Sequence, residues 1–137
     1  MKYPIKHGFS LIELLIAILV LSVITVFAYP SYQHYVAKTH RTDGQVALMD
    51  LSARMERYYQ QNNHSFVNAT PALLGVNTTT PGGYYNLNIT NLSTTTYLLQ
   101  ANPIGTQLRD DALCGTLTVD QLGQKGITGK APVAECW

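Results

Sequence analysis

The chain has 137 residues, 46% of them hydrophobic, and its formal net charge at pH 7 is +1. This length suits one domain with an appendage. Beyond Pro30, seven basic residues balance seven acidic ones. Because the charge is balanced, no global electrostatic footprint for nucleic acid or for an anionic membrane surface is predicted, although a local patch stays open.

The N-terminus divides into a short basic leader and a long apolar run. Residues 1–8 read MKYPIKHG, with two lysines and no acidic residue, and residues 9–29 are almost entirely apolar. As a helix that rises about 1.5 Å per residue, this run is long enough to cross a hydrocarbon core of about 30 Å. The flanking lysines predict that the start stays on the cytoplasmic side and that the remainder crosses the membrane.

Two general interpretations of this segment compete. A cleaved signal peptide would have a shorter apolar region, of about 7–15 residues, followed by a site of small residues. Here the run is longer, and residues 26–28 (VFA) make a poor cleavage site just before Pro30. A plain membrane anchor accounts for the hydrophobicity but leaves Glu13 unexplained.

Glu13 is the one charged residue inside the apolar run. A carboxylate within the membrane costs free energy, so it should have a partner or a function. The run holds no Lys, Arg or His to pair with it, so a partner must come from another chain or from a newly made N-terminal amine. Alternatively, the carboxylate snorkels to the interface, because Glu13 lies only one turn inside the run. The residues alone leave both interpretations open.

Residues 8–14, GFSLIEL, resemble the prepilin motif of type IV pilins and type II secretion pseudopilins. The resemblance implies that a membrane aspartyl peptidase cleaves between Gly8 and Phe9, and that the new amine of Phe9 is methylated. It also implies that Glu13 is the family's assembly glutamate and that Pro30 is its helix-kinking proline. Pairing of Glu13 with the Phe9 amine of a neighbouring subunit would set the axial register between subunits, which we state as a hypothesis.

A long helix is expected to continue beyond the apolar run. Pro30 should bend the helix rather than end it, and apolar residues then recur at helical spacing as far as Gln61. This predicts a nearly continuous helix of about 50 residues, whose apolar half projects and whose second half is embedded in a globular domain. Gly44 should weaken the helix locally. The residues expected to form the apolar face of the second half are Val36, Val46, Ala47, Leu48, Leu51, Met55, Tyr58 and Tyr59.

Three or four strands are expected after a loop over residues 62–83. The segments 84–89, 95–101 and 113–119 carry alternating or β-branched residues and are separated by turn residues. The glycines from 123 to 129 are interpreted as closing loops. The predicted fold class is α+β: a long N-terminal α-helix packed on an antiparallel β-sheet, with a C-terminal disulfide-bounded loop.

Cys114 and Cys136 are the only cysteines. Because the N-terminus argues for export, a disulfide is predicted between them, and it would contribute about 3 kcal/mol by closing its loop. The alternative is a pair of free buried thiols in a cytosolic protein. In the pilin family that the N-terminus resembles, this disulfide-bounded region is often exposed and involved in adhesion or subunit contact.

No catalytic, metal or cofactor site is predicted, and the chain is not expected to be an enzyme. The four histidines have no metal-ligand spacing. The aspartates near the C-terminus do not match an EF-hand loop and are interpreted as a solvated turn rather than a calcium site. These residues are His7, His34, His40, His64, Asp110, Asp111 and Asp120.

The predicted organisation is a leader over residues 1–8, a transmembrane and filament-core helix half over 9–29, and a globular pilin domain over 30–137. The resemblance implies a structural subunit of a type IV pilus, a filament that serves adhesion, twitching motility and DNA uptake. The alternative is a type II secretion pseudopilin. A membrane-anchored enzyme or receptor would need a cleft of converging titratable groups, which the sequence does not display, and would leave the prepilin motif unexplained.

The expected partners are other pilin subunits, the prepilin peptidase and the inner-membrane assembly machinery. DNA binding through Lys125 and Lys130 is an unsupported alternative. The expected location is the bacterial inner membrane for the precursor and the extracellular pilus afterwards. Residues 55–66, MERYYQQNNHSF, and the C-terminal ECW resemble PilE-like minor pilins, but the sequence does not separate a major from a minor subunit.

Overall fold

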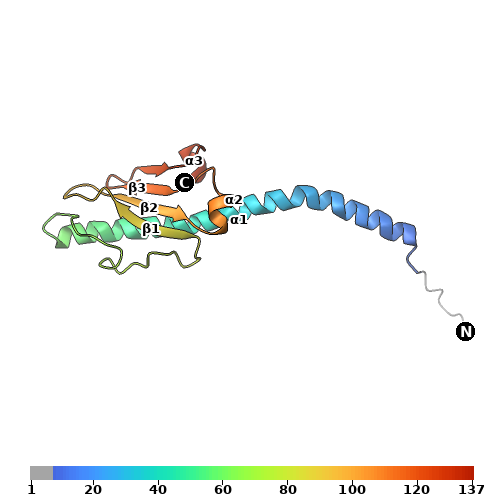
Figure 1. Cartoon of the computed structure of the whole chain (residues 1–137), viewed down its shortest axis with the longest axis horizontal. Helices are drawn as coiled ribbons and strands as arrows, with labels where there is room; N and C mark the ends of the chain where they lie inside the picture. The colour runs from blue at the N-terminus through green and yellow to red at the C-terminus, as the bar shows by residue number, and fades with distance from the viewer. Residues whose placement is uncertain (1–7) are drawn as a thin grey trace, which may run out of the picture. The chain divides into compact units, whose positions relative to one another are not determined.

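The computed structural model describes residues 8–137 (Figure 1). This part of the chain divides after Gln33 into an N-terminal unit, residues 8–33, and a globular unit, residues 34–137. Its elements in chain order are α1 (Leu11–Gln61), β1 (Tyr85–Thr90), β2 (Leu98–Pro103), α2 (Thr106–Asp110), β3 (Leu117–Asp120), β4 (Lys125–Ile127) and α3 (Val133–Cys136).

Helix α1 has 51 residues and continues through Pro30, which confirms the predicted long helix. Whether Pro30 bends it stays a prediction. The helix ends after Gln61 because Asn63 and His64 take left-handed backbone conformations, with φ of 50° and 58°. Asn tolerates this region and commonly ends helices in this way.

The four strands form one antiparallel sheet in the order β1-β2-β3-β4. Three or four strands were predicted, and the structure shifts the bounds of the three named segments by one to four residues. The interpretation of residues 120–129 as loops was wrong, because Lys125–Ile127 pairs with β3. A three-residue strand with a central glycine shows no alternating pattern. It forms because Asp120 Oδ1 accepts hydrogen bonds from the N–H groups of Leu122 and Gln124, which turns the chain back.

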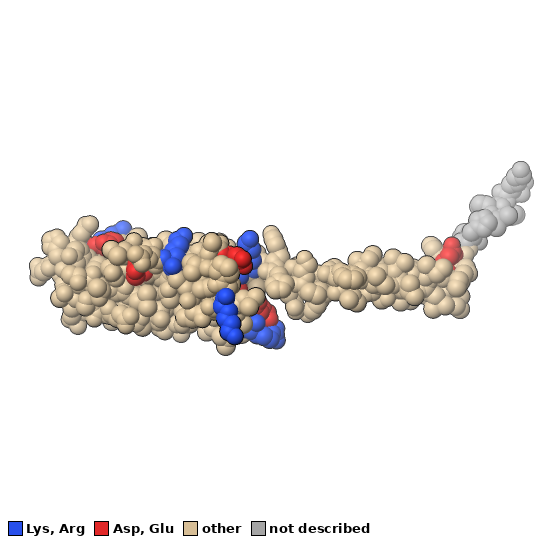
Figure 2. Space-filling model, turned by 90° about the horizontal axis from the view of Figure 1, so that it is seen from above, with Lys and Arg blue, Asp and Glu red and all other residues tan. Residues whose placement is uncertain are grey.

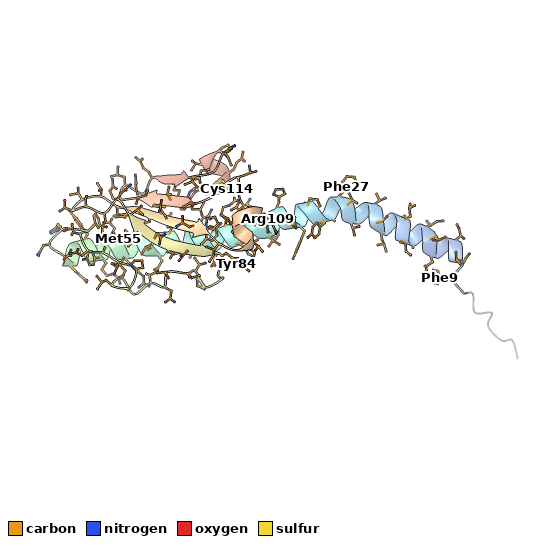
Figure 3. The ribbon with its side chains drawn as sticks, viewed as in Figure 1. Phe9, Phe27, Met55, Tyr84, Arg109 and Cys114 are labelled. Atoms are coloured by element: carbon orange, nitrogen blue, oxygen red, sulfur yellow. A yellow bond between two sulfur atoms is a disulfide. The ribbon has the colours of Figure 1, made fainter. Side chains whose placement is uncertain are left out.

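Alternate residues of the strands bury their side chains against the second half of α1. Leu48, Leu51 and Met55 are fully buried there, as predicted, and Figure 3 labels Met55 on the second half of α1. Val46 was predicted on the apolar face, but 63% of it is exposed. The strand residues that complete the core are Tyr85, Leu87, Leu99, Ala101, Leu117 and Val119.

Gly44 has a packing role that its sequence context did not reveal. It is buried in α1, and a Cβ at this position would lie 3.1 Å from ring carbons of Tyr85. That distance is tighter than ordinary van der Waals contact, so the glycine lets the aromatic ring of β1 approach the helix closely. Glycine lowers the local stability of the helix, and the close contact with Tyr85 offsets this cost.

Candidate functional site

Glu13 lies in the first turn of α1. Its Oε2 accepts a hydrogen bond from the backbone N–H of Ser10 at 2.9 Å. Since α1 begins at Leu11, Ser10 is the residue before the helix and Glu13 is its third residue, the positions of a capping box. Glu13 therefore has a partner within its own chain. This contact was not predicted, although the Ser-x-x-Glu spacing signals it.

The N-terminal unit has an apolar surface on every side. The large apolar side chains from Leu11 to Tyr29 are between 48% and 77% exposed, and Figure 3 shows Phe9 and Phe27 extending from the ribbon. Glu13 is the only charged residue between positions 8 and 33. In Figure 2 the rest of this unit's visible face is uncharged. A helix that is apolar all round belongs in a membrane or inside a bundle of helices.

Helix α1 is also long and apolar enough to cross a membrane, and none of its most apolar window is buried within the described chain. By length and composition, the N-terminal unit therefore suits both a lipid environment and a bundle of helices. A move from one to the other needs no change in its secondary structure.

The globular unit contains a polar cluster, which we call the Arg41 cluster: Arg41, Tyr85, Gln107 and Asp111. Arg41 donates to Asp111 from Nε at 2.8 Å and from Nη2 at 2.5 Å, so the ion pair is bidentate. Tyr85 and Gln107 donate to Asp111 Oδ2 at 3.2 and 3.1 Å. Such charge-assisted bonds are stronger than neutral ones. The prediction that Asp111 lies in a solvated turn was wrong, because only 3% of it is exposed.

The Arg41 cluster joins segments that are far apart in sequence. Gln107 Nε2 on α2 donates to the backbone oxygen of Ala37 on α1 at 2.9 Å. Arg41 Nη1 donates to the oxygen of Glu135, and Gln45 Nε2 to that of Cys136. These two carbonyls end the short helix α3 and would otherwise lack intrahelical partners. The stretch of α1 from Ala37 to Gln45 thus anchors both α2 and the C-terminal segment.

The cluster also changes the proton affinity of its members. The hydrogen bond from Arg41 to Asp111 raises the pKa of the guanidinium, and this outweighs the opposing effect of burial. Burial raises the pKa of the Tyr85 phenol above its ordinary value. Arg41 therefore stays charged and Tyr85 stays neutral at physiological pH. Each member is occupied by a partner inside the chain, which suits a structural role.

A disulfide joins Cys114 and Cys136, both of which are buried, across a sequence separation of 22 residues. Cys114, labelled in Figure 3, precedes β3 rather than lying within it as predicted. Nearby, Trp137 Nε1 donates to the oxygen of Gly126, and Lys125 Nζ lies 4.9 Å from the centre of the Trp137 ring. The disulfide and these contacts hold β4 and the C-terminus together.

The predicted processing and assembly residues lie in the N-terminal unit, away from the Arg41 cluster in sequence. The predicted leader covers residues 1–8, and its first seven, His7 included, lie outside the described residues. Cleavage between Gly8 and Phe9 stays a prediction. His40 stacks on Tyr84 with ring centres 3.5 Å apart and contacts Gln107 through Nδ1. Among residues 8–137, no group of three His, Cys, Asp or Glu side chains is arranged to hold a metal ion.

Comparison with known proteins links both units to pili. Residues 30–118 match the family described as "Type IV minor pilin ComP, DNA uptake sequence receptor". Residues 4–29 match the prokaryotic N-terminal methylation motif. A fimbrial protein of Dichelobacter nodosus is 30% identical over 132 residues, which cover 96% of this chain and 81% of that protein.

Two further proteins of type IV pili are similar to this chain. The type IV major fimbrial protein FimA of Dichelobacter nodosus is 39% identical over 46 residues, covering 34% of this chain and 28% of that protein. The non-core minor pilin PilV of Neisseria meningitidis has a similar fold, with a TM-score of 0.57 and 22% identity over 72% of this chain and 92% of that one. The matching family is one of structural pilins rather than a class of enzymes. The chain belongs to the ComP family of type IV minor pilins.

Proposed function

We propose that this pilin is held in the inner membrane as a precursor and then packs through its N-terminal unit into an extracellular type IV pilus. The observation that carries the proposal is the surface of residues 11–29, which is apolar all round and exposed along its whole length. In water this surface would aggregate, so it needs lipid before assembly and other helices afterwards. The fimbrial relatives support a pilus rather than a secretion pseudopilus.

Glu13 is proposed to serve two contacts in succession. Before assembly, one carboxylate oxygen caps its own helix at Ser10. A carboxylate has about four acceptor positions, so this cap leaves capacity for a second donor. Cleavage after Gly8 would create a charged amine on Phe9, and the amine of a neighbouring subunit is proposed to bind the remaining positions. The prepilin peptidase and the inner-membrane assembly machinery are the partners that these steps require.

The experiment compares Glu13→Gln and Glu13→Ala in cells. An amide oxygen still accepts from the Ser10 N–H, but Gln carries no charge, whereas Ala removes both functions. We expect both variants to enter the membrane and to lose filaments from the sheared surface fraction. Ser22→Ala removes an uncharged polar side chain from the same apolar helix. This variant is the control and should assemble. Normal filaments from Glu13→Gln would contradict the charge-pairing step.

Intact mass measurement tests processing independently. The mature chain should begin at Phe9 with one additional methyl group and should lack two hydrogens at the cysteine pair. A mature filament subunit that retains residues 1–8 would overturn the processing step while leaving the fold and the helix packing untouched.

A second proposed function is DNA capture during uptake, because the matching family is described as a DNA uptake sequence receptor. The globular unit offers exposed basic side chains interspersed with acidic ones, as Figure 2 shows for its visible face. Arg109 pairs with Asp110 at 2.8 Å, and Lys125 lies over Trp137. Lys130 is exposed, lies between Lys125 and Trp137 in the sequence, and is our first test position.

The test measures binding of a DNA duplex to the detergent-solubilised chain at several salt concentrations. Each phosphate contact contributes a slope of about 0.9 in a plot of log affinity against log salt. We expect Lys125→Ala and Lys130→Ala each to weaken binding and to lower this slope by about one. Arg57→Ala, which removes an exposed cation from the far end of α1, is the matched control. Equal effects of all three substitutions would contradict a local DNA site.

A further inference from the structure

The outer face of the sheet, on the side away from α1, is formed by uncharged polar side chains. Strand residues alternate between the two faces, so the neighbours of the buried core positions point outward. On β1 these are Asn86 and Asn88, and on β2 they are Gln100 and Asn102. Thr118 on β3 continues the face. Amides and hydroxyls both donate and accept hydrogen bonds.

Three of these groups form one row across the strands. Asn88 is paired with Gln100 in the register, Gln100 with Thr118, and Thr118 with Gly126 of β4. Adjacent strands lie about 4.8 Å apart, so the row has a regular spacing. Within the described chain, the side chains of Asn88, Gln100 and Thr118 make no hydrogen bond to other protein groups, whereas the neighbouring Asn102 accepts from Thr116 at 2.9 Å.

Gly126 keeps the end of the row open. A Cβ at this position would lie only 2.6 Å from Thr118 Oγ1 and would cover the hydroxyl. The glycine has no positive φ, so backbone conformation does not require it. The absence of a side chain here leaves Thr118 accessible to a molecule lying along the row.

The charges around the face restrict what can bind to it. Asp120, at the end of β3, is the one charged outward residue on the four strands, and its Oδ1 is occupied by the N–H groups of Leu122 and Gln124. Lys125 is paired with buried Val119, so it lies on the opposite side, where it contacts Trp137. Without cations, the face cannot neutralise phosphates or sulfates. Leu98 is its only large apolar residue, which makes it a poor match for an apolar protein surface.

We propose that the row of Asn88, Gln100 and Thr118 binds a neutral, hydroxyl-rich polymer, that is, an uncharged polysaccharide. Each sugar hydroxyl is both a donor and an acceptor, and the row presents both functions without charge. Gln100 and Thr118 are half-buried, which restricts their motion and lowers the entropy lost on binding. The contact of one subunit is weak, and repeated contacts along a polymer or a filament would strengthen it. This site is separate from the basic residues proposed above for DNA.

The test measures retention of the full chain on beads carrying dextran, mannan or galactan, in a zwitterionic detergent that contains no sugar. Beads with heparin and with duplex DNA represent the polyanionic alternatives. We expect retention on at least one neutral polysaccharide, insensitivity to raised salt, and competition by the same polysaccharide in solution. Gln100→Leu and Asn88→Ala should each reduce the affinity about threefold to tenfold, as expected for the loss of a neutral hydrogen bond.

Two further variants make the result specific. Gly126→Ala should weaken retention by covering Thr118, although it removes no polar group. Gln60→Leu, at an exposed amide near the end of α1, should leave retention unchanged, and thermal unfolding checks that each variant is folded. The proposal would be overturned if the chain were retained on none of the three neutral polysaccharides. It would also be overturned if Asn88→Ala and Gln100→Leu left retention unchanged. Retention on heparin or DNA alone would assign the face to a polyanion instead, with the pilus function unaffected.

Discussion

The two units of this pilin differ in whether their side chains find packing partners within the chain. In residues 8–33 the apolar side chains have no covering layer, and one carboxylate, that of Glu13, caps the helix start. In the globular unit the apolar side chains are buried, and the buried charge of Asp111 has three partners in the same chain. The N-terminal unit therefore depends on lipid or on other subunits, whereas the globular unit is complete by itself.

The difference does not arise from residue type or secondary structure. Leu21 and Leu51 belong to the same helix, yet 61% of Leu21 is exposed and none of Leu51 is. Only the sheet packed on the second half of α1 distinguishes them. Helix formation and burial are thus separate properties along one continuous element, and the following experiments test that separation.

The largest expected effect comes from Asp111→Ala. It would leave Arg41, whose side chain is only 12% exposed, without its carboxylate, which should cost about 3–5 kcal/mol of the free energy of unfolding. Denaturant unfolding of the full chain in detergent, followed by near-UV circular dichroism, measures this loss. Asp110→Ala is the control, because its partner Arg109 is 75% exposed and such pairs contribute about 0–1 kcal/mol. Equal losses from both substitutions would show that the Arg41 cluster does not anchor the unit.

A paired truncation compares the two halves of α1 directly. Leu51→Ala should lower the free energy of unfolding by about 2–5 kcal/mol, because it creates a cavity in the core. Leu21→Ala removes the same atoms from an exposed position and should leave unfolding of the globular unit unchanged. The same denaturant titration serves both variants. A loss of comparable size from Leu21→Ala would show that the two units unfold as one.

Loss of the disulfide should destabilise the globular unit by about 3 kcal/mol, given the loop that it closes. Replacing both Cys114 and Cys136 with serine, or reducing the unsubstituted chain, should give similar decreases in the denaturant midpoint. Membrane insertion of the N-terminal unit should be unaffected, since that unit contains no cysteine. If reduction of the disulfide left the denaturant midpoint unchanged, the Arg41 cluster alone would hold the C-terminal segment.

The smallest effect concerns alkaline pH. Burial raises the pKa of Tyr85 and, to a lesser extent, of Tyr97 in the folded chain. Above about pH 10 the unfolded chain therefore loses these protons first, and stability should fall as pH rises. Below that range both phenols are neutral in both states and contribute no pH dependence. Tyr85→Phe should make the alkaline decrease in the denaturant midpoint shallower, and an unchanged decrease would contradict the role of burial.

Local patterns predicted several features of the chain correctly. The apolar run, its basic flank and Glu13 were visible because membrane insertion depends on consecutive residues. The long helix and three strands followed from periodicity, and the cysteine pair followed from the argument for export. For the candidate site, the Ser10–Glu13 cap was not predicted, although it is also encoded locally in the Ser-x-x-Glu spacing.

Only the tertiary structure decided the remaining features. Asp111 looks like a residue of a polar turn, and its burial depends on Arg41, which lies 70 residues earlier. Strand β4 depends on pairing with β3, and the exposure of Val46 depends on which side of α1 the sheet covers. The sequence by itself determined the apolar first half of α1 and its capped start, because those properties follow from neighbouring residues. The polar cluster and the uncharged sheet face required contacts between distant segments, which no local pattern records.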